Sequence, residues 1–277
     1  MPENILEALK KSGHKKAKIA VSDIDGVLRG KYVHIDKLQS LLKNGFGFCS
    51  VIFGWDSSDV CYDNSSYTGW HTGYPDTKAN VDPKTMRFVP WDNKVPFFLA
   101  DFVDEKNQAL DVCPRQLLKK MNRKLNDMGF YGKVGCEYEW FNFKESAESL
   151  EEKNYAHLTP LTSGMFGYSL LRSSQNSEFF NQLQDSMEEF KVPLEGLHTE
   201  TGPGVYEAAL CVADPVEACD RSILFKTGAK EIAQKHGVMA SFMARWSKEY
   251  PGSSGHIHLS LENSKQENLF YDRTDKN

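Results

Sequence analysis

The sequence predicts an α+β fold in two parts, and three observations support this prediction. Short segments in which apolar and polar residues alternate, as they do in strands, recur along the 277 residues. Before residue 112 these segments accompany one main helical pattern and a long polar loop, which is typical of a small α+β domain. From residue 112 onward, longer amphipathic helices alternate with strands. We therefore expect a small domain over residues 1–111 and a larger α/β domain over residues 112–277.

The elements of the first domain follow from its turn and stop signals. Asp25-Gly26 is a dipeptide typical of hairpins, so the strand before it should return as a second strand. Gly45 is expected to end the main helix, because glycine tolerates the backbone conformation found just past a helix end. The expected helices are residues 4–13 and 35–44, the expected strands are residues 16–21, 48–53, 86–89 and 97–102, and the polar loop is residues 56–82.

The second domain opens with a predicted helix over residues 114–128. Leu117, Met121 and Leu125 recur at helical spacing and should form an apolar stripe. Gly129 is expected to end this helix.

The most clearly marked helix of the second domain is residues 214–236. Asp214 is placed as its N-cap, and Pro215 suits its first turn. Glu217 is placed to complete a capping box, and Gly237 follows the end. The other expected elements are a helix at residues 177–190, strands at residues 136–141, 165–171, 238–246 and 256–261, and a charged loop at residues 144–160.

Composition and charge exclude several classes of protein. The net charge is −5 and no basic cluster alternates with aromatic residues, so a nucleic-acid partner is not expected. The six cysteines form no Cys-x-x-Cys pair, which favours free thiols in a reducing compartment over disulfides or a zinc site. The N-terminus lacks a signal-peptide pattern, and no apolar run approaches the roughly 20 residues that span a bilayer. We expect no membrane association and a cytoplasmic location.

Residues 136–141 place two carboxylates within an apolar, aromatic strand. Because side chains alternate along a strand, Glu137 and Glu139 share one face, and the aromatic residues beside them face the other way. Two like charges on a half-buried face repel each other and lose solvation unless a cation lies between them. Oxygen ligands of this kind suit Mg²⁺ or Mn²⁺. A solvated strand face with two exposed glutamates is the alternative.

A second pair of carboxylates flanks a glycine-rich bend. Gly202-Pro203-Gly204 lies between Glu200 and Glu207, and an apolar segment follows. Such a bend lets the backbone approach a ligand closely and brings the two carboxylates toward one point. An ordinary hairpin with polar flanks is the alternative.

A third motif carries imidazoles on a strand. His256 and His258 share one strand face and follow a loop of small residues, 252–255. Imidazole can ligate a metal, and a neighbouring histidine or serine can hydrogen-bond phosphate oxygens, whereas a lone histidine is more often an ordinary surface residue. Together, four glutamates and one or two histidines predict the ligands of two adjacent divalent cations, which would bridge the phosphates of a nucleotide.

The three motifs, in this order, resemble those of the glutamine synthetase family. The order is Glu-x-Glu, then His-x-Glu with Gly-Pro-Gly and a further Glu, then a Gly-Ser loop with His-x-His-x-Ser. The resemblance covers nearly the whole chain. Its shorter matches are Asp56-Ser57-Ser58, similar to the family's N-terminal aspartate loop; Cys113-Pro114-Arg115, similar to the start of its catalytic domain; and Lys226, Gly228, Lys230, His236-Gly237 and Phe242-Met243, similar to the elements before the histidines.

This resemblance implies a fold, an assembly and a reaction. The fold would be a small β-grasp N-terminal domain followed by a larger catalytic α/β domain. The assembly would be a homo-oligomeric ring in which the N-terminal loop of one subunit completes the active site of the next. In the reaction, ATP phosphorylates the γ-carboxylate of glutamate, and ammonia or an amine then displaces phosphate to give a γ-glutamyl amide.

The resemblance also implies roles for residues that match the family's motifs. Glu139, Glu200 and Glu207 would hold one Mg²⁺ or Mn²⁺, and Glu137 and His256 would hold the second, nearer the ATP phosphates. The remaining roles are nucleotide contact by His258 and Ser260, glutamate contact by Gly252, and deprotonation of the amine by Asp56.

Several positions depart from the family pattern. Val205 stands where the family usually has glutamine, and Pro251 stands where it commonly has asparagine. Residues 244–246 replace a usual Lys-Pro pair. These departures resemble the branch that joins glutamate to larger amines, such as polyamines or alkylamines.

The chain is also shorter than family members, which continue past its polar tail at residues 274–277. The continuation carries arginines that grip phosphate and glutamate, a last metal-binding glutamate and a substrate flap. We expect either a fragment of a longer protein or a natural truncation with little synthetic activity. The alternatives to a ligase are a non-catalytic structural or regulatory subunit and, more remotely, a kinase of the creatine type.

Overall fold

The computed structural model describes residues 2–272 and 274, so residues 275–277 of the polar tail lie outside the description. The chain divides into two compact units, residues 1–124 and 125–277. Both mix helices with a largely antiparallel sheet, which confirms the predicted α+β class. No helix among the described residues is long and apolar enough to cross a membrane.

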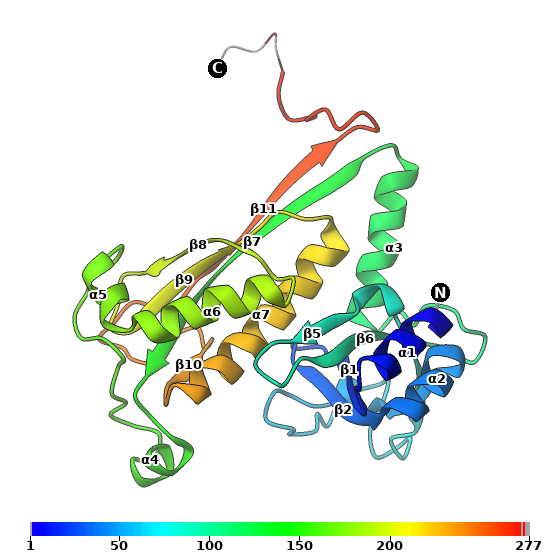
Figure 1. Ribbon diagram of the computed structural model, residues 1–277, viewed down its shortest axis with the longest axis horizontal. Helices are drawn as coiled ribbons and strands as arrows, with labels where there is room; N and C mark the ends of the chain where they lie inside the picture. The colour runs from blue at the N-terminus through cyan, green and yellow to red at the C-terminus, as the bar shows by residue number, and fades with distance from the viewer. Residues whose placement is uncertain (1, 273, 275–277) are drawn as a thin grey trace. The chain divides into compact units, whose positions relative to one another are not determined.

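The first unit is built on a six-stranded sheet. Strands follow the order β2-β1-β6-β4-β3, with β5 paired to β6, and β1 and β6 run parallel in the middle. This is the expected β-grasp arrangement, with helices α1 and α2 in the same unit (Figure 1). The strands are β1 (Lys16–Ser22), β2 (Leu28–His34), β3 (Phe46–Cys49), β4 (Asp76–Val81), β5 (Arg87–Val89) and β6 (Val95–Val103), and the helices are α1 (Pro2–Lys11), α2 (Ile35–Asn44) and the 3₁₀ turns η1 (Ser50–Phe53) and η2 (Pro83–Thr85).

The central strand β6 shows why this unit has a core. All nine of its residues are buried, as expected for a strand covered on both faces. The buried side chains of α1 and α2, including Leu9 and Leu38, belong to the same apolar cluster as Phe98 and Phe102 of β6. Gly45 ends α2 with a positive φ of 72°, as predicted.

Two predictions in this unit were wrong. The expected strand 48–53 stops at Cys49, and the remainder forms η1, because a 3₁₀ turn buries Ser50, Ile52 and Phe53 together. The last part of the predicted polar loop 56–82 is not a loop but strand β4 (Asp76–Val81). β4 has only two buried residues, Ala79 and Val81, and pairing with β3 and β6 supplies the order that its own polar sequence does not indicate.

Helix α3 (Pro114–Asp127) begins at the predicted residue and ends one residue before the predicted end, but it lacks the predicted buried face. Leu117 and Met121 of the expected apolar stripe are 47% and 51% exposed. The first turns are held by cations instead. Arg115 lies 2.8 Å from Asp101 and 3.1 Å from Asp82, and Lys119 contacts the same two carboxylates.

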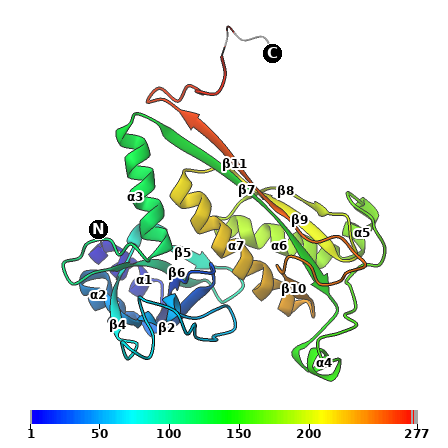
Figure 2. The ribbon, with the colours of Figure 1, turned by 180° about the vertical axis from the view of Figure 1, so that it is seen from behind.

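The second unit is built on a five-stranded antiparallel sheet. The long strand β7 pairs with β9 on one side and with β10 and β11 on the other, and β8 follows β9. Helices α6 and α7 lie over one face of this sheet (Figures 1 and 2). The strands are β7 (Tyr131–Phe143), β8 (Leu194–Thr199), β9 (Val205–Leu210), β10 (Met239–Ser241) and β11 (Gly255–Glu262), and the helices are α4 (Ala147–Glu152), α5 (Leu170–Gln175), α6 (Ser177–Glu189) and α7 (Pro215–Lys235).

Aromatic packing decides which face of this sheet is covered. Trp140 of β7 and Tyr206 of β9 are fully buried, with ring centroids 5.8 Å apart. Phe225 of α7 packs 5.5 Å from Trp140, and Phe179 of α6 stacks on Tyr206 at 6.0 Å. Because strand side chains alternate, Glu139 and Glu207, which are next to these rings in the sequence, must face away from the helices, and Glu137 shares the face of Glu139.

Four local predictions for the second unit failed. Residues 165–171 form a turn and the start of α5, and Tyr168 has a positive φ of 54° that a strand does not allow. The strand expected over 238–246 is only three residues long. The loop 144–160 contains the short helix α4. Asp214 is the N-cap of α7, as predicted, but the expected capping box lacks its Asp214 bond, because the Asp214 carboxylate binds Lys133 at 2.9 Å instead.

The ionic anchor of α3 can be tested by removing its cation. Arg115→Met should lower the free energy of unfolding by about 3 kcal/mol, because buried Asp101 would lose a partner. Urea denaturation measures this change. Lys120→Met removes an exposed ion pair with Asp111 and should cost less than about 1 kcal/mol. Equal effects of the two variants would contradict the anchor.

A buried carboxylate near α4 gives a pH-dependent prediction. Hydrogen bonds from Lys153 and Ser149 lower the pKa of Glu145 from its ordinary 4.5 to about 2. Its stabilising contribution should be present above pH 4.5 and disappear as the pH falls toward 2. The stability difference between wild type and Glu145→Gln should therefore shrink from pH 7 to pH 3. Unfolding in urea at both pH values measures it, with exposed Glu151→Gln as the control.

Candidate active site

Strand register in the second unit places acidic residues and histidines on the face opposite the helices. In the β7–β9 ladder Glu139 lies directly opposite Glu207, and in the β8–β9 ladder His198 also lies opposite Glu207. On the other side of β7, His256 lies opposite Glu137. Directly opposed side chains share a face and lie close together. The carboxylates therefore form a continuous acidic row across the sheet, which we call the carboxylate face: Glu137, Glu139, Glu200 and Glu207.

One group on this face joins β7, β9 and β11. Glu137, Glu207 and His256 each offer a ligand atom, and these atoms lie within 4.8 Å of one another. His256 Nδ1 is 3.2 Å from Glu137 Oε2. His258 Nε2 is also 3.2 Å from that oxygen. The carboxylate of Glu137 thus lies between two imidazoles.

A second group joins the two sides of the β8–β9 hairpin. His198, Glu200 and Glu207 offer ligand atoms within 4.8 Å of one another. The His198 nitrogens lie 3.9 Å from Glu200 Oε2 and 3.5 Å from Glu207 Oε2. The glycine-rich stretch, residues 202–204, forms the turn of the β8–β9 hairpin, so a hairpin, which the sequence left as the alternative, is present. The same turn brings Glu200 and Glu207 together.

Gly204 fixes the position of that turn. Its φ is +71°, and a Cβ added there would lie 2.3 Å from the Asn142 carbonyl oxygen, so no other residue fits without displacement. The backbone N–H and the side-chain amide of Asn142 both donate to the Gly204 carbonyl, at 2.8 and 3.1 Å. Asn142 lies on β7, so these bonds hold the Glu200 and Glu207 hairpin against the strand that carries Glu137.

The electrostatics of the carboxylate face are those of crowded like charges. Burial raises the pKa of Glu207, and the charges of Glu139, Glu137 and Glu200 raise it further against the opposing effect of His198. The pKa of Tyr168 is also raised, chiefly by the charge of Glu200. The face therefore has a negative potential that a bound cation would relieve.

The donor set fits a divalent cation. Carboxylate oxygens with one or two imidazoles are ligands that Mg²⁺ and Mn²⁺ accept. Oε2 of Glu200 is buried and has no hydrogen-bond partner among the described residues. A buried acceptor of this kind is costly unless it is satisfied, and a metal ion would satisfy it.

Glu139 differs from its predicted neighbours. It belongs to neither ligand group found among the described residues. Its two oxygens accept hydrogen bonds from the hydroxyl and the backbone N–H of Ser254, at 2.5 and 3.0 Å. Ser254 belongs to the loop before β11 and was not singled out by the sequence.

The predicted nucleotide and glutamate contacts lie on and beside β11. His256, His258 and Ser260 occupy every second position of the strand and therefore share one face. The hydroxyl of Ser260 accepts a hydrogen bond from the side-chain amide of Asn268 at 2.8 Å. Gly252 precedes the strand, and a Cβ there would lie 2.6 Å from the Ala244 carbonyl oxygen. Glycine at 252 thus has a structural reason of its own.

Asp56 lies in the first unit, in the loop after η1. Its Oδ1 accepts hydrogen bonds from the backbone N–H groups of Ser58 and Val60, at 2.8 and 3.0 Å. One oxygen of the Asp56 carboxylate therefore stabilises the turn of its own loop, and Oδ2 accepts no hydrogen bond from the described residues.

Besides Ser254, the sequence did not assign a role to two further residues of the site, His198 and Tyr168. His198 was quoted within a motif but given no role, although alternation of His198 and Glu200 along a strand signals a shared face. Tyr168 stacks on His198 with ring centroids 4.4 Å apart. Its loop is held to β8 because the Tyr168 N–H donates to the Thr199 carbonyl at 2.7 Å. No local pattern indicates that contact.

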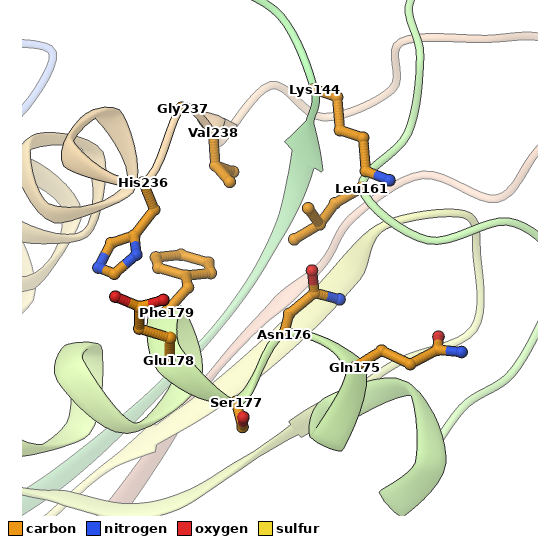
Figure 3. A pocket seen from close by; sticks show the side chains of 10 residues that line it. All are labelled: Lys144, Leu161, Gln175, Asn176, Ser177, Glu178, Phe179, His236, Gly237 and Val238. Atoms are coloured by element: carbon orange, nitrogen blue, oxygen red, sulfur yellow. The ribbon is translucent and has the colours of Figure 1, made fainter.

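A cavity of about 610 Å³ lies elsewhere in the second unit (Figure 3). Asn176 and Phe179 at the start of α6, His236 at the end of α7 and Lys144 after β7 line it. None of the residues of the carboxylate face lines this cavity.

Comparison with known proteins places the chain in a family. Residues 111–277 match the family model "Glutamine synthetase, catalytic domain". The chain is 54% identical to type-1 glutamine synthetase 2 of Dictyostelium discoideum over 99% of its length and 52% of that protein. It is 34% identical to the glutamate–isopropylamine ligase of a Pseudomonas species over 93% of its length and 56% of that protein.

The fold agrees with these matches. A solved structure described as apo GmaS without ligand superposes with a TM-score of 0.81 at 22% identity, over 97% of this chain and 59% of that one. The chain thus spans about half the length of the relatives it matches. By its catalytic-domain match and its close relatives, it belongs to the glutamine synthetase family, a family of ligases.

Proposed function

We propose that the protein is an ATP-dependent ligase that joins glutamate to ammonia or a primary amine through a γ-glutamyl phosphate. The observation that carries this proposal is the carboxylate face, whose four glutamates lie beside the three histidines His198, His256 and His258. Transfer of a phosphoryl group between two anions is mainly a problem of positioning and charge neutralisation. An acidic cluster suited to divalent cations supports that chemistry.

The proposed roles follow the two ligand groups, with Glu139, which belongs to neither group, added to the first metal ion. Glu200 and Glu207, with Glu139 beside them, would hold one Mg²⁺ or Mn²⁺, and Glu137 with His256 would hold the second. These ions would supply positive charge that lets the phosphates of ATP approach the carboxylate of glutamate. Ser254 would orient Glu139, because it donates to both oxygens of that carboxylate.

The remaining residues would position the substrates. His258 and Ser260 of β11 would contact the nucleotide, and the close-packed backbone at Gly252 would lie against glutamate. Asp56 would accept a proton from the ammonium form of the acceptor, leaving a neutral amine whose nitrogen attacks the acyl phosphate and expels phosphate. In this proposal Asp56 comes from the domain at residues 1–111 of a neighbouring subunit in a homo-oligomeric ring, and the other residues come from residues 112–277.

The acceptor is proposed to be a primary amine or ammonia. Relatives named for isopropylamine and for ethanolamide synthesis support an amine, and the 54%-identical type-1 glutamine synthetase supports ammonia. Val205 is buried in an apolar cluster with Phe141 and Phe143, and its side chain offers no hydrogen bond beside Glu207.

The reaction can be tested with the purified full-length gene product, because this chain spans about half the length of its relatives. With ATP, glutamate and Mg²⁺ or Mn²⁺, we expect one ADP released per γ-glutamyl amide formed when ammonium, isopropylamine or ethanolamine is supplied. Coupled ADP detection and mass spectrometry of the product measure the two yields. Tight Mn²⁺ binding without any product would contradict the ligase and favour a non-catalytic subunit.

Removing one charge from the carboxylate face should affect metal binding and stability in opposite directions. Glu207→Gln should weaken Mn²⁺ binding by at least about tenfold, because Glu207 belongs to both ligand groups. The metal-free variant should be more stable than metal-free wild type, because a charge repelled by its neighbours is gone. Calorimetric titration and thermal unfolding measure the two effects.

Glu195→Gln on the exposed side of β8 is the matched control and should change neither quantity. Lower stability of the metal-free Glu207→Gln protein, with unchanged Mn²⁺ affinity, would show that the carboxylates are structural.

A further inference from the structure

The β1–β2 hairpin of the first unit contains a buried carboxylate that fixes an arginine. Asp23 is only 1% exposed, and its Oδ1 accepts the backbone N–H groups of Asp25 and Val27 at 3.0 and 2.8 Å. Its Oδ2 accepts from Nε of Arg29 at 2.8 Å. A buried carboxylate without a cation is strongly unfavourable, so the position of this guanidinium is determined by the hairpin.

The rest of the Arg29 guanidinium contacts the loop that carries Asp56. Nη1 lies 2.6 Å from Asp59 Oδ1, and Nη2 donates to the carbonyl of Asp56 at 3.4 Å. The guanidinium carbon lies 4.9 Å from the ring centroid of Trp55, in cation–π geometry. One side chain therefore contacts residues 55, 56 and 59, which lie on both sides of the turn.

The turn that carries Asp56 contains one residue in an uncommon backbone conformation. Asp59 has a positive φ of 64°, a conformation that is uncommon outside glycine, although aspartate adopts it more often than most residues. The turn closes through the Asp59 N–H to the Asp56 carbonyl at 3.1 Å and the Asp56 N–H to the Val60 carbonyl at 3.0 Å. The ion pair with Arg29 offsets the cost of the Asp59 conformation and holds the turn that leaves Oδ2 of Asp56 free.

We propose that Arg29 is a positioning residue for Asp56: it links the buried Asp23 to Asp59 and so holds the Asp56 carboxylate where it meets the amine. This inference rests on the proposed role of Asp56 as the proton acceptor. Arginine is required because its planar fork contacts Asp23 and Asp59 at the same time, whereas a lysine ammonium can replace only one of these contacts well.

The sharpest test removes only the loop side of the link. Asp59→Asn keeps the shape of the side chain and tolerates positive φ, and it leaves the buried Asp23–Arg29 pair intact, so the fold should survive. Asp111→Asn is the matched control, because it removes an exposed carboxylate paired with Lys120 in the same unit. Arg29→Lys and Arg29→Gln form a second pair, in which lysine should rescue part of the effect.

Two measurements are made on each variant. Hydrogen exchange of the Ser58 and Val60 amides, which donate to Asp56, should be at least about fivefold faster in Asp59→Asn and unchanged in Asp111→Asn. In the synthesis assay, KM for the amine should rise at least about fivefold, with KM for ATP and glutamate unchanged. A merely structural role would not produce this selective change.

Each other outcome overturns a defined part of the inference. Unchanged exchange in Asp59→Asn would show that Arg29 does not hold the loop. Faster exchange with an unchanged KM for the amine, or with all three KM values raised equally, would leave a structural contact and remove the positioning role. If wild type makes no γ-glutamyl amide, the proposed function fails and the catalytic meaning of the link fails with it, while hydrogen exchange still decides whether Arg29 holds the loop.

Discussion

Repulsion among carboxylates on one face of a β-sheet is the constraint on which the second unit depends. Glu139 and Glu207 are directly opposed in the β7–β9 ladder, an arrangement that destabilises a sheet when both are charged. Glu137 and Glu200 lie close enough to raise the pKa of Glu207 further. A fold that keeps such a face needs compensating groups. Here these are the imidazoles of His198, His256 and His258, the donors of Ser254, and the divalent cations that we propose.

The opposite face of the same sheet supplies the stability that the carboxylate face lacks. Trp140 and Tyr206 are completely buried beneath α6 and α7, and each is adjacent in sequence to a glutamate of the carboxylate face. Burial of aromatic surface provides large favourable free energy, so the strands can hold repelling charges on their other side. The contacts of Gly204 with Asn142 then set the hairpin that places Glu200 beside Glu207.

The first unit uses buried charges in a different way. Asp101 and Asp23 are both nearly inaccessible, and each is paired with an arginine that reaches a second segment. Arg115 ties the start of α3 to the sheet, and Arg29 ties the Asp56 loop to the β1–β2 hairpin. In both places the arginine pairs with one buried aspartate, Asp101 or Asp23, and with a second aspartate that is more exposed, Asp82 or Asp59. Such pairs fix geometry more than they add stability.

The sequence by itself determined much of this molecule. Local periodicity, stop signals and residue type predict the bounds of α2 and the presence of helices α3 and α7. They also predict that Glu137 and Trp140 lie on opposite faces of their strand and that the site is made of carboxylates and imidazoles. These properties depend on neighbours within a few positions, so they can be read along the chain. The family resemblance rested on the order of short motifs, and the comparisons confirmed it.

Only the tertiary structure decided which residues face each other. Strand register set Glu139 opposite Glu207 and His256 opposite Glu137, and no local pattern gives register between segments about 70 to 120 residues apart. The strand β4, the exposed stripe of α3, the bond from Ser254 to Glu139 and the stacking of Tyr168 on His198 were missed for the same reason. Each depends on a partner distant in sequence, whose position is fixed only when the core packs.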